Sequence, residues 1–158
     1  MAMPSPTAPT KNVYPLIVAQ YAIKGHRRRT EHWALVLLYS RLHGLKLELK
    51  GNTDTFTYLT ERLTAFERAQ DLRGGCLVGW VDAERVQALV DRLKKVRVRR
   101  NDPAWDGQDW VMEALRALKE EHMVFSRVDE NWLRTELMED LERSESGLGE
   151  TVEERLFP

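Results

Sequence analysis

The sequence predicts an α+β domain, in which a mainly antiparallel sheet of four to six strands carries helices packed on one side. Two observations predict this fold class. Short segments rich in β-branched and aromatic residues fill the first half of the chain, and apolar residues at helical spacing dominate only the second half. The length of 158 residues suits one domain. We expect a flexible arm over residues 1–11, the domain over residues 12–143 and a polar tail over residues 144–158.

The first strands are predicted from composition and alternation. Residues 13–23 are apolar, β-branched and interrupted by a proline, which favours a strand over a helix. A polar loop over residues 24–30 follows. Residues 31–40 carry apolar side chains on both faces, which is typical of a buried strand. Residues 45–51 alternate between leucine and charged residues, and the turn at Gly44 makes these two segments a predicted hairpin.

The next segments complete the predicted sheet. Residues 53–63 are rich in Thr, Tyr and Phe, which indicates a further strand or a bent hairpin arm. Gly74 and Gly75 are expected to break the chain before a short strand over residues 76–81.

Three helices are predicted after the last strand. Asp82 can cap the first of them, whose apolar residues recur at helical spacing as far as Leu93. Asp106 or Asp109 is expected to open the second helix, and the third is expected over residues 129–143.

Composition excludes several classes of protein. The 24 Lys and Arg balance 25 Asp and Glu, so we expect no nucleic-acid partner, and the basic clusters at residues 26–30 and 94–100 are interpreted as solvated charge. No apolar run approaches the length of a membrane span, and no secretory signal is evident, which predicts a cytoplasmic protein. The lone Cys76 is interpreted as core packing, and the four histidines show no metal-ligand spacing. We therefore expect neither a metal nor another cofactor; the oligomeric state stays open.

Two short segments could carry chemistry. His32 stands at the start of a buried strand and after a basic loop, which places it at the rim of the sheet, although an isolated histidine is usually structural. Gly107 lies at the predicted start of the second helix, where backbone N–H groups can receive an anion or a polarised oxygen. The alternative is that Asp106 or Asp109 is an ordinary N-cap.

Together, the strand EHWALVLL and the segment WDGQDWVMEAL resemble a known family. They are similar to the circularly permuted papain-like domains of the NlpC type, in particular the lecithin:retinol acyltransferase-like family, and more closely to uncharacterised fungal proteins with an Asn-Cys-Gln-Asp-Trp-Val motif. In that family a His-Trp-Ala-Leu strand supplies the general base, and a cysteine at a helix N-terminus is the nucleophile. The resemblance spans roughly residues 13–125. It implies a papain-like fold in which His32 takes the position of the family's catalytic histidine.

The sequence departs from this family at the nucleophile. Asp106 and Gly107 stand where the family has Asn-Cys, and glycine cannot replace a thiolate, so covalent thioester chemistry is excluded. Gln108 and Asp109 follow the nucleophile position. The family's third polar group lies on the strand after the hairpin turn, which corresponds to a position near Glu48.

The resemblance and these residues together imply a protein that binds a small molecule in a papain-like domain without the cysteine. It could be a non-covalent acid/base enzyme, such as a cyclase, isomerase or lyase of fungal secondary metabolism. In that case His32 transfers the proton, Glu48 or Asp106 orients the imidazole, and the backbone of residues 107–109 lines the substrate site and stabilises negative charge. The alternative is a non-catalytic pseudoenzyme that binds a protein partner. A concave pocket beside His32 would favour the first function, and an exposed apolar patch around Trp132 would favour the second.

Overall fold

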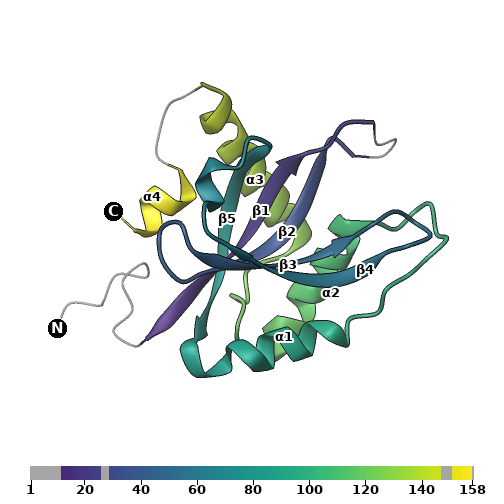
Figure 1. The fold of residues 1–158 in the computed structure, drawn as a ribbon, viewed down its shortest axis with the longest axis horizontal. Helices are drawn as coiled ribbons and strands as arrows, with labels where there is room; N and C mark the ends of the chain where they lie inside the picture. The colour runs from purple at the N-terminus through teal and green to yellow at the C-terminus, as the bar shows by residue number, and fades with distance from the viewer. Residues whose placement is uncertain (1–11, 26–28, 147–150, 158) are drawn as a thin grey trace.

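In the part of the chain that the computed structural model describes, residues 12–25, 29–146 and 151–157, five strands form one antiparallel sheet in the order β4-β3-β2-β1-β5 (Figure 1). The predicted arm over residues 1–11 lies outside the described residues. The strands are β1 (Val13–Ala22), β2 (Glu31–Leu38), β3 (Gly44–Lys50), β4 (Thr57–Leu63) and β5 (Leu72–Asp82). The α+β class is therefore confirmed.

The strand register brings the polar residues of β2 and β3 onto one face. The predicted hairpin is confirmed, because β2 pairs with β3 antiparallel and Val36 lies opposite Lys46. On its other side β2 pairs with β1, where His32 lies opposite Tyr21. Side chains alternate along a strand, so His32 and Val36 share a face with Lys46 and Glu48.

The predicted break at Gly74 and Gly75 is wrong, because β5 runs through both residues. Gly74 adopts a φ of 105°, and the pairing of β5 with β1 shifts register between Ala19 and Tyr21. The carboxylate of Asp140 accepts a hydrogen bond of 2.8 Å from the Gly75 N–H and occupies the space that a side chain on Gly74 would need. The glycines therefore form an irregularity inside the strand instead of ending it.

The helices are α1 (Val86–Lys94), α2 (Gly107–Glu120), α3 (Glu130–Ser146) and the short α4 (Val152–Leu156), with 3₁₀ turns η1 (Phe66–Arg68) and η2 (Ala83–Arg85). The prediction that Asp82 caps a helix is wrong, because η2 precedes α1 and the Asp82 side chain makes no capping hydrogen bond. The prediction for α2 is confirmed: Asp106 is its N-cap, and Asp109 completes a capping box.

Two apolar layers cover the two faces of the sheet. Helices α1, α2 and α3 pack with the larger core cluster on one face, and Figure 1 shows α3 crossing behind β1 and β5. The opposite face carries a smaller cluster that includes Phe66 of η1 and Val152 of α4, so the prediction that the helices pack on one side of the sheet is wrong for α4. The interpretation of residues 144–158 as a polar tail is thus wrong in part. Helix α3 extends to Ser146, and Val152 is buried because it and Leu156, one turn later, present apolar side chains to the sheet.

Candidate functional site

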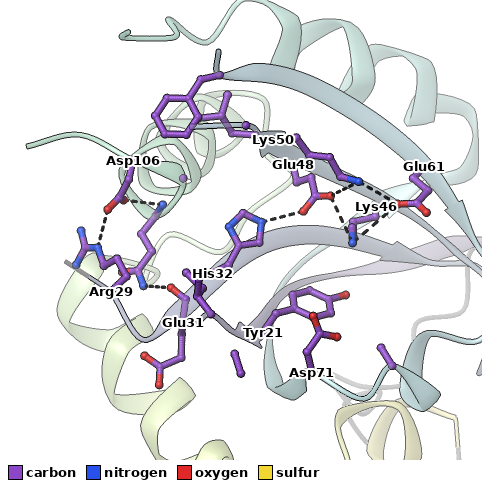
Figure 2. A pocket seen from close by; sticks show the side chains of 18 of the residues that line it. Tyr21, Arg29, Glu31, His32, Lys46, Glu48, Lys50, Glu61, Asp71 and Asp106 are labelled. Atoms are coloured by element: carbon purple, nitrogen blue, oxygen red, sulfur yellow. Dashed lines mark hydrogen bonds and ion pairs between the residues drawn. The ribbon is translucent and has the colours of Figure 1, made fainter. Parts of the chain in front are cut away.

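The central residue of the site is His32, whose ring is hydrogen-bonded to a carboxylate on the neighbouring strand. His32 lies near the start of β2, and its Nε2 is 2.8 Å from Oε2 of Glu48 on β3. The Glu48 side chain is only 4% exposed, whereas that of His32 is 28% exposed. Figure 2 shows the imidazole directed toward Glu48.

Two lysines surround the other oxygen of Glu48. Lys46 Nζ lies 3.4 Å and Lys50 Nζ 3.7 Å from Glu48 Oε1, and both ammonium groups also lie 3.9 Å from Glu61 Oε2 on β4. Burial acts to raise the pKa of Glu48, but the hydrogen bond with His32 and the charge of Lys46 outweigh it and hold that pKa below its ordinary value. Glu48 is therefore an ionised acceptor.

The charge of Glu48 determines how the imidazole is oriented. A carboxylate can only accept hydrogen bonds, so Nε2 of His32 carries the hydrogen and donates it to Glu48. In the neutral ring, Nδ1 is then the acceptor. The acid that orients His32 is thus Glu48.

Gly107 faces this second nitrogen. A Cβ built on Gly107 would lie 3.2 Å from Cε1 and 3.3 Å from Nδ1 of His32. The expected juxtaposition of His32 with the start of the second helix is therefore confirmed. The space that a side chain at position 107 would fill lies directly against the acceptor nitrogen of the ring.

The N-terminus of α2 is less open to an anion than the sequence suggested. Oδ1 of Asp106 accepts hydrogen bonds from the N–H groups of Gln108 at 3.0 Å and Asp109 at 3.5 Å. Oδ2 of Asp109 in turn accepts a hydrogen bond from the Asp106 N–H at 2.9 Å. The N-cap alternative is therefore correct, and the prediction that the backbone of residues 107–109 stabilises negative charge is wrong for these two N–H groups.

The carboxylate of Asp106 also forms an ion pair with Arg29. Nε of Arg29 donates to Oδ2 of Asp106 at 2.9 Å, and its Nη2 lies 3.7 Å from Oδ2 of Asp109. Burial, with a smaller contribution from the adjacent Asp106 charge, raises the pKa of Asp109. Asp106 therefore stabilises the helix end and anchors Arg29.

Gln108 connects three elements. Its Nε2 donates to the carbonyl oxygen of Glu31 at 2.8 Å, and its Oε1 accepts from Nη1 of Arg134 on α3 at 3.0 Å. Gln108 thus ties α2 to the residue before His32, which holds the imidazole and Gly107 in their relative positions.

These residues line one cleft with a volume of about 930 Å³. Its lining includes the apolar residues Leu49, Phe56, Pro103 and Trp105, together with polar residues such as Asn52 and Thr53. The lining also includes Tyr21, Lys46, Glu61, Phe66 and Asp71, and Figure 2 shows Tyr21 and Asp71 close to each other. The sequence predicts no role in the site for Tyr21, Arg29 and Lys46. Of these three, only Lys46 could have been found from the sequence, because it shares the charged face of its strand with Glu48 and Lys50.

Cys76 is not part of the cleft lining. It lies on β5, is buried in the larger core cluster and pairs in register with Val18. Burial, together with the charges of Glu136 and Asp140, raises the pKa of its thiol to about 12. The thiol is therefore protonated at neutral pH, and its interpretation as core packing agrees with this environment.

We expect the Cys76 thiol of the native protein to resist alkylation by iodoacetamide and to react once the chain is unfolded in urea, because burial protects it and keeps it protonated. A thiol introduced by Gly107→Cys in a Cys76→Ala background is expected to react much faster, since it would adjoin His32 at a helix N-terminus. Mass spectrometry of the alkylated protein measures both rates. Equal rates for the two thiols would contradict the geometry at Gly107.

Glu48→Gln is expected to destabilise the protein in a pH-dependent manner. Because the folded-state pKa of Glu48 is lowered, its charge stabilises the fold fully above the ordinary pKa near 4.5, and this contribution is lost as the pH falls through the folded-state value. The difference in unfolding free energy between wild type and variant should therefore shrink below about pH 4.5. Urea unfolding across the acid range measures it, with Glu61→Gln as the exposed control. A difference that stays constant with pH would disprove the stabilising charge.

Within the described ranges, no three His, Cys, Asp or Glu side chains are grouped so as to hold a metal ion. None of the helices described has the length and apolar character needed to cross a bilayer.

A family model described as a family of unknown function, DUF6914, matches residues 14–139. Searches of curated proteins and of solved structures return no match.

Proposed function

Because the chain belongs to the DUF6914 family, whose function is unknown, we propose its function from the cleft: it binds a small molecule and transfers a proton on that ligand with His32. The observation that carries this proposal is that the two ring nitrogens of His32 have different surroundings. Nε2 is bonded to the buried, ionised Glu48, and Nδ1 is directed into the cleft beside Gly107.

This arrangement supports general acid/base catalysis. A histidine that is fixed in one tautomer by a carboxylate presents its lone pair in a constant direction, and it can take a proton and return it. Glu48 then stabilises the imidazolium that forms transiently. In this role Glu48 is a positioning residue, because its contact is with His32 and not with the ligand.

The reaction class follows from what the cleft lacks. Gly107 carries no nucleophile, and Cys76 is buried in the core, so the chain itself offers no thiol at the site. We therefore propose chemistry without a thioester intermediate, such as cyclisation, isomerisation or elimination. The resemblance to papain-like domains fits this proposal, because Gly107 stands at the position of the nucleophile in that family.

The second candidate function, a non-catalytic module that binds a protein, has less support. Among the described residues, the exposed large apolar side chains are Tyr39, Leu59 and Met138, and they lie after β2, on β4 and on α3. Trp132, around which an apolar patch was expected, is half-buried and lies beneath the guanidinium of Arg127. The concave cleft favours the small-molecule function.

A paired incubation tests the proposal. Wild type and His32→Gln are each incubated with fractionated small-molecule extracts, and the mixtures are compared by mass spectrometry. We expect compounds that are converted by wild type only. His43→Ala is the matched control, because His43 is exposed and bonds to Ser40 outside the cleft. Conversion that is the same in His32→Gln would refute the acid/base role.

A further inference from the structure

We infer that the part of the cleft beside Gly107 and Nδ1 of His32 is a subsite for a hydroxyl or thiol group of the ligand, carried on an apolar body at least as large as one aromatic ring. This inference rests on the proposed function and names the ligand group that His32 acts on. The ligand then supplies the oxygen or sulfur that the chain lacks at position 107.

Distance is the first argument for a proton donor in this space. The imidazole of His32 packs against Gly107, since a Cβ there would lie 3.3 Å from Nδ1, and both residues line the cleft. An oxygen or sulfur atom of a ligand that enters the cleft beside Gly107 can therefore come within hydrogen-bond reach of Nδ1. Because the Nε2–H of His32 donates its hydrogen bond to the carboxylate of Glu48, Nδ1 is the acceptor in the neutral ring. The group that satisfies it must carry an O–H, S–H or N–H.

The charges around Gly107 give the second argument. The carboxylate of Asp106 lies at the helix end, its side chain 8% exposed, and it already accepts the N–H groups of Gln108 and Asp109. Arg29 is bound to Asp106 and lies near Asp109, so its charge is balanced by these carboxylates. An anionic ligand group would meet acceptors here, whereas a neutral donor is favoured.

The walls give the third argument. The lining of the cleft includes Leu49, Phe56, Pro103 and Trp105, and the ring centroids of Phe56 and Trp105 lie 5.8 Å apart in an edge-to-face contact. A volume of about 930 Å³ accommodates a molecule well beyond the size of one aromatic ring. The body that carries the donor is therefore apolar, and a phenol is the simplest compound with both features.

Phenol and anisole test the subsite on the wild-type protein, because they share the ring and differ in the O–H. Binding is followed by NMR of the labelled imidazole nitrogens, with the His32 signals assigned by their loss in His32→Gln. We expect phenol to shift the His32 signals and to bind about tenfold more tightly than anisole, which is the effect of one hydrogen bond of about 1–1.5 kcal/mol. His43→Ala should bind phenol normally.

Gly107→Ala is the second arm. Its Cβ would fill the subsite and press on the imidazole, so phenol should lose most of its affinity while circular dichroism shows an intact fold. Equal affinity for phenol and anisole, or phenol binding that leaves His32 unperturbed, would overturn the inference. In either case, conversion that depends on His32 in the paired incubation would still stand, so the subsite can fail separately from the proposed function.

Discussion

His32→Ala is expected to slow conversion of the cleft's substrate by about 10²–10⁴-fold, which is the usual contribution of a positioned proton-transfer group. The reason is that His32 presents the acceptor nitrogen at Gly107, and Glu48 is the only acidic side chain bonded to its ring among the described residues. The rate constant kcat, measured under substrate saturation, gives the effect. His43→Ala should leave it unchanged.

Glu48→Gln separates positioning from binding in the same assay. The neutral amide cannot hold an imidazolium as the carboxylate does, and its NH₂ group can donate to Nε2, which would transfer the ring hydrogen to Nδ1. We expect kcat to fall while KM stays near the wild-type value, because Glu48 contacts His32 and not the ligand. A kcat for His32→Ala equal to that of wild type would end the acid/base assignment.

Trp110→Ala is expected to lower the free energy of unfolding by about 3–5 kcal/mol, the typical loss for a large aromatic side chain in a core. Trp110 lies in the first turn of α2, has no exposed surface and stacks on Tyr58 of β4 with the ring centroids 5.5 Å apart. Its removal opens a cavity between α2 and the sheet. Urea unfolding measures the loss.

Trp110→Phe is the matched control for that cavity. The indole Nε1 is buried without a hydrogen-bond partner in the described part of the chain, so a phenylalanine removes a polar group that already lacks a partner. We expect this variant to lose far less stability than Trp110→Ala. If Trp110→Ala abolished conversion at full stability, Trp110 would belong to the chemistry and not to the core.

The fold predictions succeeded where neighbouring residues determine the structure and failed where residues distant in the sequence determine it. The hairpin of β2 and β3 was predictable because Leu45, Leu47 and Leu49 alternate with charged residues, and this pattern is local. The start of α2 was predictable because Asp106 and Asp109 satisfy N–H groups only a few residues away. The continuation of β5 through Gly74 was not, because it depends on Asp140 from α3.

The candidate site could also be predicted from the sequence only in part. The pairing of His32 with Gly107 came from two motifs that resemble a known family, since neither spacing nor composition relates residues so far apart. The register that places Glu48 against His32 could not be settled from the sequence, because a shift of one residue would turn that carboxylate to the other face of the sheet.

The sequence alone determined which residue types are available at the site: a histidine at the rim of a strand, a glycine where a nucleophile would stand, and aspartates that cap the following helix. Local alternation and capping also determined most of the strands and the start of α2. Only the tertiary structure decided that Nε2 of His32 faces Glu48 and Nδ1 faces Gly107, and that Asp106 binds Arg29 instead of the imidazole. The physical reason is that ring orientation and ion pairing depend on strand register and helix docking, which arise from packing across the whole sheet.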